Sequence, residues 1–174
     1  MPNLLILLAC LILGVFSRWL PHPPNFTPVI AIAIFIGMRF QQKWLVVLTP
    51  LAIMFISDIF LGFHNTAIVT YASLILLSLA VMSAPKNGIF KSKSIQIASF
   101  SLVGSIWFFL LSNASVWWFT DMYSHNLTGL KASYIAGLPF FKNTLISTLV
   151  FSTVLVLVDK WILRHAPSSS LAKV

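Results

Sequence analysis

Residues 44–61 read WLVVLTPLAIMFISDIFL, and this run decides the class of fold. Asp58 is its only charged side chain, and the run is as long as the apolar helix of about 17–25 residues that crosses a bilayer. Gly62 ends the run, and Pro50 inside it is expected to kink the helix. The sequence therefore predicts a membrane-spanning helix here.

Five further apolar runs lie on either side of this segment. They cover residues 3–17, 28–40, 66–84, 94–112 and 143–163, and the fifth of the six predicted spans has room to extend toward Trp118. The run 28–40 is short, so we expect a helix that is tilted, extended by its flanks, or only partly spanning. The pattern predicts an all-α membrane protein of six transmembrane helices, with one domain over residues 1–165 and a flexible cytoplasmic tail over residues 166–174.

The composition supports a lipid environment. Of the 174 residues, 59% are hydrophobic and 8% are charged, whereas a soluble domain carries about 25% charged residues. The net charge of +8 could suggest a nucleic-acid partner. However, the basic residues stand singly between apolar runs, which is typical of membrane topology and not of a phosphate-binding surface. We therefore expect the lipid bilayer, and no nucleic acid, as a partner.

The distribution of Lys and Arg predicts the orientation. With six spans, one side holds both termini and eight basic residues: Arg39, Lys43, Lys86, Lys91, Lys93, Lys160, Arg164 and Lys173. The other side holds three: Arg18, Lys131 and Lys142. Because basic loops stay in the cytoplasm, we expect cytoplasmic termini in a multi-pass protein of the bacterial inner membrane.

The predicted outer loops carry most of the informative polar residues. They cover residues 18–27, 62–65 and 113–142. A loop as long as the last is uncommon in a compact domain, so it should contain a short helix, a re-entrant segment or a lid.

Asp58 near the outer end of its helix needs an explanation, because an acid there costs about 2.5–3.5 kcal/mol on insertion scales. An ion pair with Arg18 would pin two helices together. A contact with a substrate or a cation, or a solvated helix end, is the alternative. The sequence leaves these readings open.

Other candidate groups give weaker signals. His22, His64, His125 and Asp121 fall on the outer loops, but their spacing matches no standard metal signature. Aromatic residues around Trp117 form either an interfacial belt or a stacking wall for a ligand. Cofactor, nucleotide and nucleophile motifs are missing from the sequence, so we predict neither an enzyme nor a bound cofactor or metal.

Four stretches resemble a known family: residues 18–28 (RWLPHPPNFTP), 57–64 (SDIFLGFH), 112–113 (SN) and 136–144 (AGLPFFKNT). Together they resemble a bacterial family of small, uncharacterised membrane proteins. That family is in turn similar to the substrate-binding S-components of energy-coupling factor (ECF) transporters. The resemblance implies a six-helix S-component-like bundle with cytoplasmic termini and a pocket near the outer face, covered by the three outer loops.

The resemblance also raises the question of an energising partner. S-components dock on an ECF-type ATPase module through small residues spaced as A-x-x-x-A on the first helix. This chain has Ala9 there, but Leu13 stands where the second small residue would be. Cobalamin-specific relatives act alone and use a cysteine near the pocket, a place that Cys10 does not occupy. Docking is therefore doubtful, and a solitary transporter stays open.

We accordingly expect a transporter-type protein that binds a small molecule, such as a vitamin or cofactor precursor, in a cavity of about 300 Å³ or more. The predicted ligand-binding residues are Arg18, His22, Asn25, Asp58, His64, Asn113 and Trp117. Two alternatives remain. A structural cell-envelope protein of the rod-shape type would scatter these residues without a common cavity. An intramembrane enzyme would bring Asp58, Asp121 and the histidines within metal-ligand distance.

Overall fold

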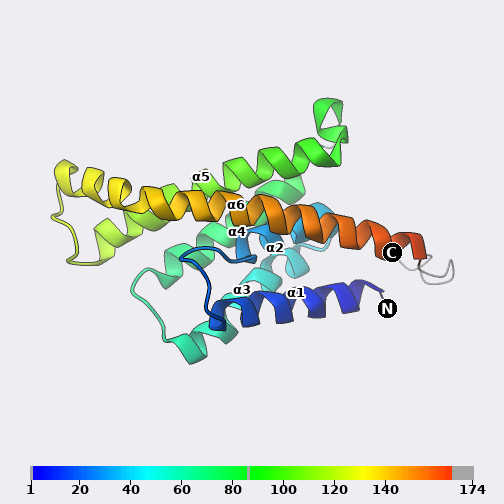
Figure 1. Ribbon diagram of the computed structural model, residues 1–174, viewed down its shortest axis with the longest axis horizontal. Coiled ribbons are helices and arrows are strands. Elements are labelled where there is room, and N and C mark those ends of the chain that lie inside the picture. Colours follow the sequence, from blue (N-terminus) through cyan, green and yellow to red (C-terminus); the bar gives the residue numbers. More distant parts are fainter. Residues whose placement is uncertain (1, 86, 166–174) are drawn as a thin grey trace.

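The computed structural model describes residues 2–85 and 87–165, which form a bundle of six α-helices and one short 3-10 helix (Figure 1). The elements are α1 (Pro2–Trp19), α2 (Val29–Arg39), α3 (Lys43–Leu61), α4 (Ala67–Ser83), η1 (Gly88–Lys91), α5 (Lys93–Phe119) and α6 (Leu127–His165). The ends of α1 to α4 lie within two residues of the predicted ones, and the all-helical class is confirmed. α3, α5 and α6 are long and apolar enough to cross a membrane, whereas α1, α2 and α4 are shorter apolar helices.

The predicted long loop over residues 113–142 is wrong. α5 continues to Phe119 and α6 already begins at Leu127, so only residues 120–126 connect them. The two helices form a hairpin that extends beyond the rest of the bundle (Figure 1). The Ser133 hydroxyl donates to the carbonyl of Asn113 at 2.8 Å, and the Tyr134 hydroxyl to that of Leu110 at 3.1 Å. These contacts between α5 and α6 bind the polar side chains of the segment. The segment is therefore a helical hairpin, although its polar sequence suggested a loop.

Helix α2 lies at the centre of the bundle. Every residue from Val29 to Met38 is buried, and the helix packs against all five other α-helices. A helix that is apolar all round belongs in a core, and its 11 residues suit a core helix better than a full span. Gly37 allows α4 to approach closely, because a Cβ added there would lie 2.5 Å from the Ser78 carbonyl oxygen.

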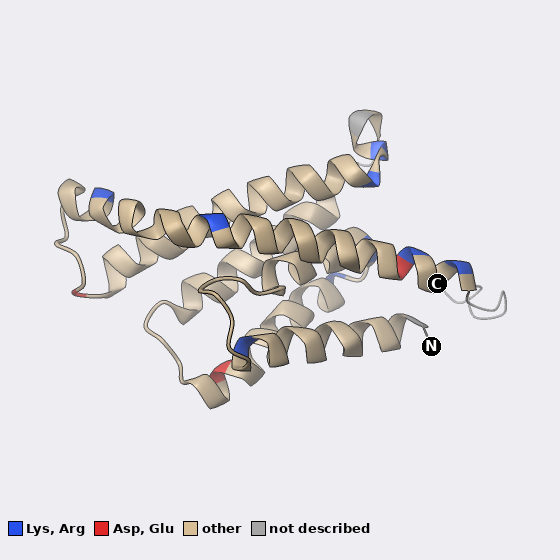
Figure 2. Cartoon of the chain, viewed as in Figure 1, with Lys and Arg blue, Asp and Glu red and all other residues tan. Residues whose placement is uncertain are grey.

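The outer surface of the bundle is rich in large apolar side chains. Leu5 is 66% exposed, Ile68 83% and Trp161 63%, a pattern typical of helices that face lipid. α1 begins and α6 ends at the same end of the bundle, here called the terminus end (Figure 1). Lys and Arg gather toward that end, and fewer lie at the opposite one, here called the cavity end (Figure 2).

Candidate functional site

A cavity of about 570 Å³ opens at the cavity end, and residues of all six α-helices and of their connections line it. Five of the seven predicted residues line it: Arg18, His22, Asn25, His64 and Asn113. Hydroxyl groups from three helices add to its polar lining: Thr70, Ser112, Ser133, Thr144 and Ser147. Apolar contact comes from Ile30, Met54, Leu74, Phe108 and Phe140. The size and mixed lining suit a small molecule with both polar and apolar parts.

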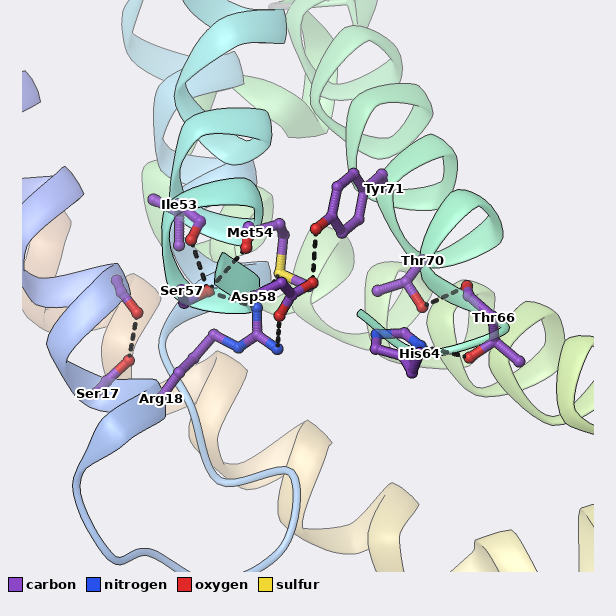
Figure 3. Close-up of polar contacts among 11 residues, drawn as sticks. Ser17, Arg18, Ile53, Met54, Ser57, Asp58, His64, Thr66, Thr70 and Tyr71 are labelled. Carbon is purple, nitrogen blue, oxygen red and sulfur yellow. Dashed lines mark hydrogen bonds and ion pairs between the residues drawn. The ribbon is translucent and has the colours of Figure 1, made fainter. Parts of the chain in front are cut away.

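Arg18, in the last turn of α1, reaches across to α3 (Figure 3). Its Nη2 lies 2.7 Å from Asp58 Oδ1, and its Nη1 donates to Ser57 Oγ at 2.6 Å and to Met54 Sδ at 3.1 Å. The predicted Arg18–Asp58 ion pair is therefore present and joins α1 to α3. Arg18 also lines the cavity, so the pair fixes one wall of the site.

Asp58 itself is fully buried and does not line the cavity. The Tyr71 hydroxyl of α4 donates to Asp58 Oδ2 at 2.6 Å (Figure 3). The other carboxylate oxygen, Oδ1, pairs with the Arg18 guanidinium. Asp58 thus supports the cavity wall from behind and ties three helices together.

The loop after α1 forms a cover that is fixed to α6. Asn143 Nδ2 donates to the Pro24 carbonyl at 3.0 Å, and Ser147 Oγ to the Asn25 carbonyl at 3.4 Å. Asn25 adopts φ 61°, a left-handed conformation that asparagine tolerates better than most residues. His22 Nδ1 lies 2.6 Å from the Leu20 carbonyl. Because a carbonyl only accepts, Nδ1 carries the proton, and in the neutral ring Nε2 is left as an acceptor.

His64 lies in the connection between α3 and α4, on the cavity rim. Its Nδ1 is 2.8 Å from Thr66 Oγ1, and the ring is exposed (Figure 3). This contact orients the ring with respect to the start of α4 while Nε2 remains available. His22 and His64 therefore each offer one ring nitrogen, from two different connections.

Asn113 of α5 lies directly against Gly137 of α6. Its Nδ2 donates to the Phe109 carbonyl at 2.8 Å. A Cβ added at Gly137 would lie 2.4 Å from Asn113 Oδ1. The glycine thus leaves the space that the amide needs at the cavity wall.

Trp117 is the one predicted residue that is neither on the cavity wall nor behind it. Its Nε1 donates to the Ser124 carbonyl at 3.0 Å, and its ring packs on Trp118 and His125. The aromatic part of the cavity lining comes instead from Phe108, Tyr123 and Phe140. Trp117 stabilises the turn between α5 and α6.

The sequence reasoning missed the part of α6 that lines the cavity. Ser133, Gly137, Thr144 and Ser147 are all buried and all line it. Small residues three, four or seven apart share one face of a helix, so this spacing was a usable signal. Ser133 and Gly137 fall in the segment that the sequence predicted to be a loop, whereas Thr144 and Ser147 fall in the predicted sixth span, so the pattern crosses a predicted helix boundary.

The intramembrane-enzyme alternative required a cluster of metal ligands. Over residues 2–85 and 87–165, no three His, Cys, Asp or Glu side chains are grouped so as to hold a metal ion. Asp121 and His125 would share a face if they were helical, but both lie in the connection 120–126. The convergence that this alternative predicts is not found in the described part of the chain.

The fold and the site define an all-helical protein with helices of membrane-spanning length and a small-molecule-sized cavity at one end. The chain belongs to a family of unknown function, DUF6580, whose model matches residues 1–169. No curated protein matches the chain, and no solved structure does.

Proposed function

We propose that this protein is a six-helix membrane protein of the bacterial inner membrane that captures a small molecule in the cavity and transports it inward. The observation that carries the proposal is the cavity of about 570 Å³, which gathers polar groups from segments far apart in the sequence. A ligand of vitamin or cofactor-precursor size fits such a volume. The resemblance of the four sequence stretches to the substrate-binding S-components of ECF transporters also supports this proposal.

The charge distribution supports an outward-facing cavity. The basic residues gather at the terminus end (Figure 2), and basic residues favour the cytoplasmic side. With both termini inside, the cavity opens to the outer side. The loop 20–28 is held to α6, so the connection 62–66, with the exposed His64 on the cavity rim, is the part that would move to admit a ligand.

The cavity also favours transport over the structural alternative. A rod-shape-type envelope protein has no need for a common polar cavity, whereas here Arg18, Asn25 and Asn113 come from three segments to line one cavity. Release would follow from tilting of the bundle. Leu13 is exposed on α1 where docking on an ATPase module would need a small residue, so we propose a transporter that works without such a module.

Native mass spectrometry of the gently purified protein tests capture. Wild type is expected to carry a small-molecule adduct. Ala136→Trp, on the cavity wall, should lose it because the indole fills the cavity, while Ala132→Trp should keep it. Ala132 is an exposed residue one turn away on α6 and outside the cavity, so it is a matched control. A wild type without any adduct, or an adduct retained by Ala136→Trp, would contradict the proposal.

Cysteine labelling tests the orientation in a Cys10→Ser background. Asn126→Cys, in the connection between α5 and α6, should react with a membrane-impermeant maleimide on intact cells. Ser92→Cys, next to η1 at the terminus end, should react only after the cells are opened. Labelling of Ser92→Cys from outside would reverse the proposed topology.

A further inference from the structure

Four buried hydroxyl groups on α5 and α6 lack a hydrogen-bond partner within the described part of the chain. They belong to Ser101, Ser105, Thr148 and Ser152. Each of these residues is at most 1% exposed. All four lie on the two helices that form the longest hairpin of the bundle.

The four hydroxyls continue the cavity lining inward. On α5, Ser105 and Ser101 follow the cavity residue Ser112 along the helix toward the terminus end. On α6, Thr148 and Ser152 follow Thr144 at intervals of four residues, on the same face.

The pairing of the two helices places these two rows side by side. α5 and α6 are antiparallel, with Asn113 against Gly137 and the ring centroids of Phe109 and Phe141 5.2 Å apart. Continued inward, this register sets Ser105 level with the cavity residue Thr144 and Ser101 level with Thr148, each to within one residue, and Ser152 follows one turn further toward the terminus end. The rows therefore form one polar track that begins at the cavity floor.

Other buried serines of the bundle behave differently. Ser73 donates to the Thr70 carbonyl at 2.8 Å, and Ser78 to the Leu74 carbonyl at 2.7 Å. Close helix packing alone would explain small residues on α5 and α6, but alanine or glycine would serve it equally well. A buried hydroxyl that stays unsatisfied costs about 1–3 kcal/mol, so four of them on one track call for a polar partner.

We infer that the four hydroxyls mark a water-accessible track that extends the cavity inward between α5 and α6. Water in a protein interior binds where several polar groups lack other partners, and this track supplies them at successive turns. Its use as the exit for a captured molecule rests on the proposed function, whereas its hydration does not.

Silver ions provide the probe, because Ag⁺ reacts with thiols and reaches them only through water. Ser105→Cys and Ser152→Cys are made in a Cys10→Ser background and reconstituted in lipid nanodiscs. Silver nitrate is added in chloride-free buffer, the protein is unfolded in SDS, and the remaining thiols are labelled with a fluorescent maleimide. Ser147→Cys, on the cavity wall, is the positive control. Ser78→Cys, equally buried but at a hydrogen-bonded serine of α4, is the matched control.

Silver is expected to abolish labelling of Ser105→Cys and Ser152→Cys, as it does for Ser147→Cys, and to leave Ser78→Cys fully labelled. Full labelling of both track variants after silver would overturn the inference. Equal protection of Ser78→Cys would also overturn it, because silver would then reach any buried position. Ser101→Cys and Thr148→Cys replace a track variant that fails to elute as a folded particle. If mass spectrometry found no ligand adduct on the wild type, the proposed function would be contradicted, but the silver accessibility of the track would be unaffected.

Discussion

The two ends of the bundle use the same pair of residue types in different surroundings. At the cavity end, Arg18 faces Asp58, whose side chain is fully buried. At the terminus end, Arg39 Nε donates to Asp159 Oδ1 at 3.1 Å, and Asp159 is 12% exposed. Each arginine lies in the last turn of its helix, where a positive charge is favourable.

The difference lies in what each pair supports. Arg39 also donates to Asn3 Oδ1 at 3.0 Å, so its cluster ties α1, α2 and α6 together close to the start of α1 and the end of α6. The Arg18 cluster ties α1, α3 and α4 together and borders a cavity. In this protein, the acid that holds an arginine beside the cavity is fully buried, whereas the acid of the pair at the terminus end is partly exposed.

The largest expected effect is that of Asp58→Asn, which leaves the Arg18 charge without its partner. Removing one member of a buried pair costs about 3–5 kcal/mol. We therefore expect a matching loss of unfolding free energy in detergent, measured by titration with a denaturant. The double variant Asp58→Asn with Arg18→Gln should recover much of the loss. If Asp58→Asn were as stable as wild type, the ion pair at the cavity end would not contribute more to stability than the pair at the terminus end.

Tyr71→Phe should have the next largest effect. It removes the hydroxyl that donates to Asp58 Oδ2, and a hydrogen bond to a charged group contributes about 1.5–3 kcal/mol. Tyr134→Phe is the matched control, because its exposed hydroxyl donates to the neutral Leu110 carbonyl. Thermal unfolding should show a clearly larger loss for Tyr71→Phe. Equal losses would show that the carboxylate does not depend on this donor.

Gly137→Ala tests the close packing of α6 against α5 at the cavity. The added Cβ would collide with the Asn113 amide, and overpacking of this kind costs about 1–3 kcal/mol. Asn113→Ala in the same chain should relieve the clash, so the double variant is expected to be more stable than Gly137→Ala alone. If the losses of unfolding free energy caused by the two substitutions were additive, the added Cβ would not collide with the Asn113 amide.

Asp159→Asn should have the smallest effect. Asp159 keeps some contact with solvent, and Arg39 keeps its hydrogen bond to Asn3, so we expect a loss of about 1 kcal/mol, as for an ordinary hydrogen bond. The loss should shrink as salt is added, because salt screens accessible charges, whereas the loss caused by Asp58→Asn should change little. A loss for Asp159→Asn as large as for Asp58→Asn, and equally insensitive to salt, would remove the contrast between the two ends.

Much of this architecture follows from the sequence alone. Apolar runs predicted the six helices, and the first four were placed within two residues at each end. The cost of burying Asp58 and the position of Arg18 made their ion pair one of the open readings, and the structure contains it. The helices and the ion pair depend on local composition and on the charge of single residues, and both can be read from the sequence.

Only the tertiary structure decided how the polar residues are used. Residues 113–119 and 127–142 are helical because Ser133, Tyr134 and Gly137 pack against α5, a condition that a local pattern does not reveal. Trp117 faces the turn and not the cavity, and Asp58 stands behind the wall and not in it. Which face of a helix a side chain occupies depends on the helix packed against it. The cavity and the hydroxyl track therefore depend on the packing of α5 against α6, which the sequence of neither helix specifies.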